Sequence, residues 1–399
     1  ACFGGSAWEY NAATNEYYLH SFAVQQPDLN WENPKVRQAC CDVVDFWTDL
    51  GADGFRCDVL DYISKDFAAD KMLNGPRLHE YIRQLFGREK TKHLFTVGEC
   101  QSDAQSICDI CGKDRDELKS VFQFEHIGLG RSDKYNPAPY RCDDIKNVLV
   151  KWQNFTAEHN LLYILFTDNH DQPPFISRIA DDQKLRYESA SLIATMFYSL
   201  RGIPFIYQGQ EIGMQNAVWN DVKEYNDINT IDQYNLAISA GLSDKEALAV
   251  CSKMSRDNAR TPVQWSDSDN AGFTTGTPWL KVNSNYKDIN VQNQENDPDS
   301  VLNYYRKLVA TRKSPEYKEV FTYGVFEPAY EDTEYVMAYY RVSDNQRILV
   351  AANFGKDAKT IELKFPVKKV VLSNVGRKEI NEVSLKLDSC EVIVIECGE

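Results

Sequence analysis

Short apolar segments alternate with amphipathic ones through most of this 399-residue chain, and this alternation restricts its fold more than any other feature. Each apolar segment is too short for a helix and rich in β-branched and aromatic residues, as strands buried on both faces are. Five strands are expected, at Gly54–Leu60, Leu94–Val97, Val121–Phe124, Leu161–Thr167 and Ile203–Tyr207. Strands and helices repeated in this way predict an α/β fold with a parallel sheet.

The segment before the first strand has the pattern of an amphipathic helix. Asn33 is a favourable N-cap residue, and Pro34 follows at the first helical position. Apolar residues then recur at steps of three and four, and a stripe of this kind normally faces the core. The stripe consists of Val36, Cys40, Val43, Trp47 and Leu50.

Four of the strands lead into a polar residue: Asp58, Glu99, His126 and Asp171. In a (β/α)8 barrel several strands each bring a side chain to one rim, whereas an open sheet concentrates its site at one crevice. We therefore predict a (β/α)8 TIM barrel.

The pattern changes after an amphipathic helix expected at Asp299 to Lys313. Short β-rich segments separated by turn residues follow, which predicts a C-terminal antiparallel β-sandwich domain at 323–399. The long polar segment 216–276 is expected to be an elaborated loop on the barrel rim.

The composition argues against several classes of partner. With 44 Lys and Arg against 59 Asp and Glu, the net charge of −15 has the wrong sign for binding nucleic acid or an anionic membrane. No apolar segment approaches the roughly 18 residues that span a bilayer.

Eleven cysteines, an odd number spread along the chain, fit a reducing compartment, so a cytoplasmic location is expected. Cys108 and Cys111 form a C-x-x-C pair without further ligands at zinc-site spacing, and no metal or cofactor is expected.

Two carboxylates have surroundings that suit them to opposite tasks. Arg56 and Asp58 are two residues apart on one strand, so their side chains point to the same face, and the guanidinium would keep Asp58 ionised as a nucleophile requires. Glu99 ends the apolar segment LFTVGE, where partial burial favours a carboxyl that keeps its proton for a leaving group. Hydrolysis of a glycosidic bond needs such a pair.

Asp171 ends another strand beside His170 and would bind sugar hydroxyls or stabilise positive charge in a transition state. A single acidic residue at a strand end is more often a cap or a surface charge, and a lone histidine is more often structural. Three acids at three strand ends of one barrel favour the functional interpretation.

The segments GFRCDV, TVGE and NHD resemble, in this order, the second, third and fourth signature regions of the alpha-amylase superfamily of glycoside hydrolases. The resemblance implies that Asp58 is the nucleophile, Glu99 the general acid/base, and Asp171 the carboxylate that stabilises the transition state. It also implies that Arg56 and His170 complete the site around the sugar at the cleavage point.

Four longer segments narrow the resemblance to the oligo-1,6-glucosidase and dextran glucosidase branch: QPDLNWENP, VFQFEHIGL, IPFIYQGQEIGM and SRDNARTPVQW. In that branch Phe124 would pack on the bound glucose and Arg256 would hydrogen-bond it. Val59, directly after Asp58, resembles α-1,6-active members, whereas α-1,4-active relatives tend to have alanine there. The alternative for Val59 is a β-branched core residue.

The chain departs from the pattern of this family at several positions. Pro174 stands where arginine is usual, Gln210 and Asn229 stand where glutamate is usual, and CQSD follows Glu99 in place of the usual residues. These positions are expected near the leaving-group subsites, so they bear on chain-length preference and rate rather than on the reaction type.

The resemblance also implies how the chain is divided. Residues 1–30 resemble the end of the domain that this family inserts after the third barrel strand, 31–322 the last five of eight strand–helix units, and 323–399 the C-terminal β-domain. The first three units, and the early calcium loop of many relatives, would be absent. Such an open barrel would expose strand edges.

The function that we expect is that of a retaining, exo-acting α-glucosidase, a monomer that removes glucose from the non-reducing ends of small α-1,6-linked oligosaccharides. Trehalose-6-phosphate hydrolase and α-1,4-glucosidase of the same family are the alternatives. Sucrose isomerases carry an arginine-rich loop that GLGRSDKYN does not match. An inactive fragment, or an ancillary homologue such as a transporter subunit, is a remote alternative because all three acids are present.

Overall fold

The structure is a computed structural model, and it describes residues 1–2, 5–112, 117–131, 138 and 141–398. The chain divides into two units, the first made of residues 1–123 and 159–161, the second of residues 124–158 and 162–399. The loop segment GLGRSDKYN lies partly outside the described residues.

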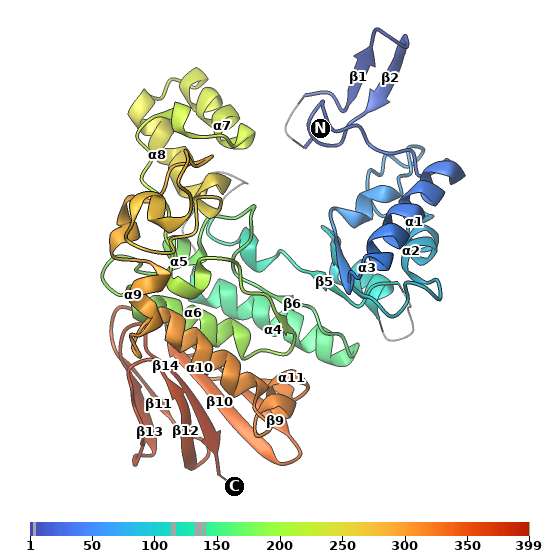
Figure 1. Cartoon of the computed structure of the whole chain (residues 1–399). Helices are drawn as coiled ribbons and strands as arrows, with labels where there is room; N and C mark the ends of the chain where they lie inside the picture. Colours follow the sequence, from blue (N-terminus) through green and yellow to red (C-terminus); the bar gives the residue numbers. More distant parts are fainter. Residues whose placement is uncertain (3–4, 113–116, 132–137, 139–140, 399) are drawn as a thin grey trace. The chain divides into compact units, whose positions relative to one another are not determined.

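The first unit contains a parallel sheet with helices between its strands (Figure 1). Its strands pair in the order β3 (Gly54–Cys57), β4 (Phe95–Glu99) and β5 (Ser120–Phe122). Its helices are α1 (Pro34–Asp49), α2 (Leu78–Phe86) and α3 (Ala104–Cys111). An antiparallel hairpin of β1 (Trp8–Asn11) and β2 (Glu16–Leu19) precedes them. Strands and helices therefore alternate here as predicted.

Strands β3 and β4 approach each other unusually closely at Gly54. A Cβ atom at this position would lie 1.9 Å from the carbonyl oxygen of Phe95, so only glycine is accommodated. The strand expected to reach Leu60 ends at Cys57, because the backbone of Val59 turns sharply after Asp58.

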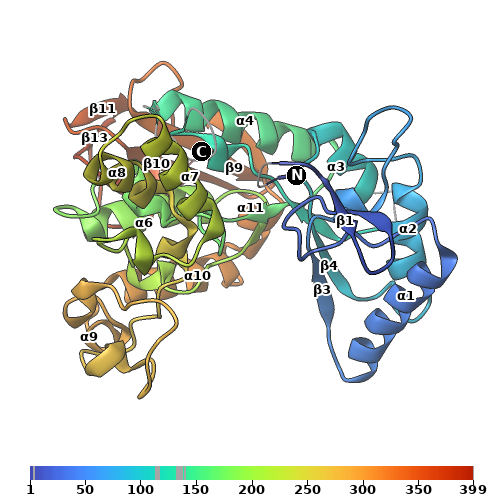
Figure 2. The same cartoon turned by 90° about the horizontal axis from the view of Figure 1, so that it is seen from above.

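Helix α1 begins as predicted but buries a different face. Asn33 accepts a hydrogen bond from the N–H of Lys35 at 3.0 Å. Helix α1 lies beside α2 (Figure 2). Arg37 of α1 donates through Nε to Gln84 of α2 at 2.9 Å. The buried residues are Cys41 and Val44. Three residues of the apolar stripe are exposed, because the apolar residues of α1 occur on more than one side of the helix. Val43, Trp47 and Leu50 are 59%, 51% and 66% exposed.

The second unit contains the parallel pair β6 (Ile164–Leu165) and β7 (Ile203–Pro204), with most of the remaining helices. Helix α6 is buried on all sides from Ser189 to Tyr198 and packs against α10 and against strands β10 (Gln346–Asn353) and β14 (Val392–Cys397). The α-helices of this unit are α4 (Cys142–Glu158), α5 (Phe175–Ile179), α6 (Arg186–Tyr198), α7 (Ile228–Ser239), α8 (Asp244–Met254), α9 (Val291–Glu295), α10 (Val301–Lys313) and α11 (Lys318–Thr322).

The segment 216–276 is more regular than expected, because it contains the helix pair α7 and α8 (Figure 1). Its polar composition hid both helices, since most residues of each are partly or fully exposed. The signal that was missed is the capping box of α8, in which Ser243 and Glu246 bond each other's backbone N–H groups.

The C-terminal region forms the predicted antiparallel domain. A five-stranded sheet has the order β12-β14-β10-β9-β8, and a two-stranded sheet pairs β11 with β13. Apolar residues of both sheets form one core, including Tyr340, Leu349 and Ile393 from the larger sheet and Ile361 and Leu385 from the smaller. The strands are β8 (Val325–Ala329), β9 (Val336–Ser343), β10 (Gln346–Asn353), β11 (Lys359–Glu362), β12 (Val367–Ser373), β13 (Ser384–Leu387) and β14 (Val392–Cys397).

Across the part of the chain that the structure describes, no helix combines the length and the apolar character needed to cross a lipid bilayer.

Candidate active site

Three charged residues meet at the carboxyl ends of β3 and β4. Strands β3 and β4 are parallel, and Cys57 pairs with Gly98. The next residues in the two segments, Asp58 and Glu99, therefore lie at the same end of the sheet. Arg56 donates through one Nη atom to Asp58 and through the other to Glu99. One guanidinium therefore holds both carboxylates at the same end of the sheet.

The two carboxylates differ in their exposure to solvent. The side chain of Asp58 is 70% exposed and that of Glu99 only 12%. Burial works against the charge of Arg56, but its hydrogen bond to Asp58 and the charge of Glu99 outweigh this effect and raise the Arg56 pKa. A permanent cation thus lies between an accessible carboxylate and a shielded one.

The chain turns abruptly after Asp58. Val59 has φ 36° and ψ 48°, a left-handed conformation that is rare for a β-branched residue and stores strain on the order of 1–3 kcal/mol. The turn leads to Asp61, whose buried Oδ2 accepts from the N–H of Gln101 at 2.7 Å and from the Ser102 hydroxyl at 2.8 Å. Asp61 therefore joins the segment after Asp58 to the unusual residues after Glu99.

A second group of site residues lies in the second unit, after β6. Oδ1 of Asp171 accepts from Arg256 Nη1 at 3.1 Å and from Arg260 Nη2 at 2.7 Å. Nε2 of His170 lies 3.3 Å from Oδ2 of the same carboxylate, and Arg260 also donates to the His170 carbonyl at 2.8 Å. The Asp171 side chain remains 33% exposed.

Arg260 was missed by sequence reasoning. It stands four residues after Arg256 in SRDNAR, and this spacing around a short helical turn was the available signal.

Phe124 lies edge-to-face against Phe166, with ring centroids 5.5 Å apart, and stays partly exposed. The structure groups Arg56, Asp58, Val59 and Glu99 in one unit and His170, Asp171 and Arg256 in the other. Their convergence on one sugar remains a prediction.

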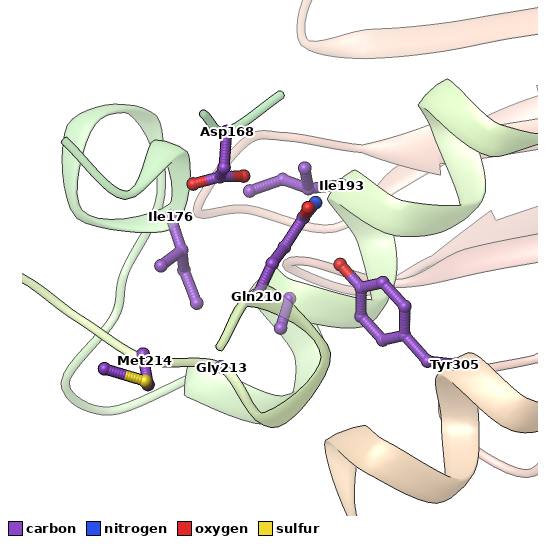
Figure 3. A pocket seen from close by; sticks show the side chains of 8 residues that line it. Asp168, Ile176, Ile193, Gln210, Gly213, Met214 and Tyr305 are labelled. Atoms are coloured by element: carbon purple, nitrogen blue, oxygen red, sulfur yellow. The ribbon is translucent and has the colours of Figure 1, made fainter. Parts of the chain in front are cut away.

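Gln210, where the family usually has glutamate, belongs to a polar network with Thr167, Asp168 and Tyr198. Its amide donates to Thr167 Oγ1 at 2.6 Å and accepts from the Tyr198 hydroxyl at 3.1 Å. Thr167 in turn donates to Asp168 at 2.6 Å, and burial raises the pKa of that carboxyl. The carboxylate of a glutamate at position 210 would have no N–H group to donate to Thr167 Oγ1. A cavity of about 20 Å³ adjoins Asp168 and Gln210 (Figure 3).

His126, expected as a polar residue at a strand end, is a buried structural residue. Its Nε2 donates to the carbonyl of Phe166 at 2.7 Å, and its ring contacts Phe166, Phe175 and Phe197. The backbone turns at residues 126–128, which directs this ring into the core.

The stability of the protein should depend on His126 at mildly acidic pH. Burial lowers its pKa from 6.5 to about 4, so the unfolded chain binds the extra proton between these values. The stabilisation is complete above about pH 6.5 and is lost as pH falls towards 4, by up to about 3 kcal/mol. Urea unfolding of wild type and His126→Gln, whose amide can also donate to Phe166, should show wild type losing more stability on acidification. Parallel pH profiles would contradict this.

Among the described residues, no three His, Cys, Asp or Glu side chains are arranged to hold a metal ion. The eleven cysteines all lie among the described residues, and none of them forms a disulfide.

Comparisons with known proteins agree with these observations. Residues 1–324 match the profile of the alpha-amylase catalytic domain, and residues 336–394 match that of the SusG C-terminal domain of alpha-amylase. An oligo-1,6-glucosidase of Parageobacillus thermoglucosidasius is 40% identical over 406 residues, which cover 96% of this chain and 71% of that protein. A trehalose-6-phosphate hydrolase of Bacillus subtilis is 38% identical over 88% of this chain and 64% of its own length.

Among solved structures, a trehalose-6-phosphate hydrolase of Bacillus licheniformis has a TM-score of 0.92 at 35% identity. The match covers 100% of this chain and 74% of that one. The chain thus spans about two thirds of the length of the curated relatives described above.

Proposed function

Because this chain belongs to the alpha-amylase family of glycoside hydrolases, we propose that it provides the catalytic groups of a retaining, exo-acting α-glucosidase. Its substrates are small α-1,6-linked glucans such as isomaltose. The observation that carries this proposal is the arrangement at β3 and β4, where Arg56 holds an exposed and a shielded carboxylate.

Each carboxylate has one task in this mechanism. Asp58, accessible and beside the Arg56 guanidinium, attacks the anomeric carbon, and Glu99 in its protonated form gives its proton to the departing oxygen. Glu99 then removes a proton from water, which hydrolyses the glucosyl ester of Asp58. Two carboxylates that share one guanidinium are close neighbours, which supports the separation of about 5–5.5 Å used in retention rather than the 6.5–9.5 Å of inversion.

The remaining site residues act on the same glucose. Asp171, held by Arg256 and Arg260, binds its hydroxyls and stabilises positive charge as the glycosidic bond breaks. His170 and Phe124 contact the sugar, and Val59 shapes the subsite of the leaving group. No cofactor is needed, and the protein works as a cytoplasmic monomer.

The 1,6-linkage is supported by the curated oligo-1,6-glucosidases at about 40% identity. Hydrolysis of trehalose 6-phosphate is the second candidate, because a hydrolase of that substrate has 38% identity to this chain. Release of glucose from isomaltose, maltose and trehalose 6-phosphate, compared by kcat/KM, tests the proposal. We expect isomaltose to be the best substrate, and a preference for trehalose 6-phosphate would reverse the assignment.

We further propose that the chain supplies five units of an eight-unit barrel and that residues of the same protein outside these 399 supply the rest. Strand β3 is at one edge of its sheet. On α1, the exposed rings of Phe46 and Trp47 contact each other. In the second unit, Ile206 beyond β7 lines an open groove with Leu302 and Val309 of α10. Apolar surfaces of this kind indicate packing partners.

The substrate comparison should therefore be made with two proteins, the 399-residue chain and the same chain extended at its N-terminus by the corresponding segment of a relative. We expect turnover from the extended protein only, with iodide quenching of Trp47 reduced. Equal turnover by both proteins would show that the described units are sufficient.

A further inference from the structure

A continuous set of polar contacts leads from the start of α7 to the carboxylate of Asp171. Oδ1 of Asp227 accepts from Nε and Nη2 of Arg256 at 3.0 and 2.6 Å. Nη1 of the same guanidinium donates to Oδ1 of Asp171 at 3.1 Å. Arg256 thus bonds the Asp227 carboxylate through Nε and Nη2 and the Asp171 carboxylate through Nη1.

The exposed fraction of the side chain increases from Asp227 through Arg256 to Asp171. The side chain of Asp227 is 0% exposed, that of Arg256 16% and that of Asp171 33%. Asp227 is therefore shielded from any substrate, while Asp171 is open to one. A residue in the position of Asp227 can influence the reaction only through Arg256.

Asp227 is itself firmly held. It is the N-cap of α7, where its side chain accepts from the N–H of Asn229 at 3.2 Å, and its Oδ2 accepts from the Thr230 hydroxyl at 2.8 Å. Its own backbone N–H donates to Asp257 at 2.9 Å. Burial opposes ionisation of Asp227, but the hydrogen bonds and charge of Arg256 outweigh it and lower the pKa of this carboxyl.

We propose that Asp227 is a positioning residue that orients Arg256, and through it the carboxylate of Asp171, for the proposed glucosidase reaction. A guanidinium is planar, so fixing Nε and Nη2 on one carboxylate also fixes the direction of Nη1. Without Asp227, the guanidinium can turn about its long side chain, and Asp171 loses one of its two cationic partners. Only the activity measurements that test this inference depend on the proposed function.

The choice of substitution separates this role from helix capping. Asp227→Ser keeps a favourable N-cap residue but is too short to reach Arg256. Asp227→Asn keeps an oxygen that can accept from Arg256 and removes only the charge. Ser243→Ala is the matched control, because it removes the cap of the neighbouring helix α8 and contacts none of these residues.

In the extended protein, for which turnover is expected, Asp227→Ser should lower kcat/KM on isomaltose about 10- to 100-fold, as loss of a group that orients another site residue typically does. Most of the loss should fall on kcat, because Asp171 acts mainly in the transition state. Asp227→Asn should recover part of the activity. Ser243→Ala should lower stability by about 1 kcal/mol and leave the kinetics unchanged.

A double-mutant cycle tests whether the effect passes through Arg256. In an Arg256→Ala background, Asp227→Ser should change kcat/KM less than about threefold, because the residue that it orients is absent. Additive losses, or wild-type kinetics of Asp227→Ser, would overturn the inference while leaving the proposed function intact.

A crystal structure of Asp227→Ser gives a readout that does not need activity. We expect the bond between Arg256 Nη1 and Asp171 Oδ1 to be lost. If that bond persists, the inference is wrong whatever the enzyme hydrolyses, and if it is lost in a protein that cleaves no α-glucoside, only the proposed function fails.

Discussion

Asp58→Asn should reduce kcat on isomaltose by about 10⁴-fold or more, because the neutral amide cannot form the glucosyl ester on which retention depends. The fold should be unaffected, since the Asp58 side chain is 70% exposed and its ion pair with Arg56 contributes about 1 kcal/mol at most. Steady-state kinetics and urea unfolding measure the two effects separately. The assay should use the extended protein if only that form proves active.

Asp53→Asn is the matched control. Asp53 is an exposed carboxylate directly before β3, at the opposite end of the strand that leads into Asp58. The same chemical change at that end should leave kcat within about twofold of wild type. An Asp58→Asn enzyme that retains a tenth of its activity would remove Asp58 from the role of nucleophile. Retention itself is tested by NMR, which should show α-glucose as the first product.

The alternation of strands and helices was readable because buried parallel strands and amphipathic helices leave different periods in the sequence. The same reasoning identified Arg56, Asp58 and Glu99, since residues two apart on a strand, and residues at the ends of adjacent parallel strands, meet by geometry. Local rules of this kind need no knowledge of distant contacts.

Features that depend on distant contacts were not readable. The side of α1 that is buried depends on where α2 packs, and the apolar residues of α1 occur on more than one side. Asp227 and Arg256 are 29 residues apart and on different helical segments, so no spacing rule pairs them. His126 looked like a rim residue because the turn that directs its ring inwards leaves no clear mark in the sequence.

The role of Glu99 can be tested by the nature of the leaving group. Glu99→Gln should lower kcat/KM on isomaltose about 10²- to 10⁴-fold, because the departing sugar oxygen needs a proton that the amide cannot supply. Its amide oxygen can still accept from Arg56, so the arrangement around Asp58 should persist. A 4-nitrophenyl α-glucoside has a leaving group that departs without protonation, and its kcat/KM should fall by less than about tenfold.

The contrast between the two substrates is what identifies a general acid. Loss of a group that only binds sugar would affect both substrates alike, whereas loss of the acid affects the poor leaving group selectively. Glu89→Gln serves as the control, because Glu89 is 90% exposed and pairs only locally with Lys92. If Glu99→Gln lowers both kcat/KM values equally, the shielded carboxylate beside Arg56 binds substrate or supports the fold, and the proton must come from another residue.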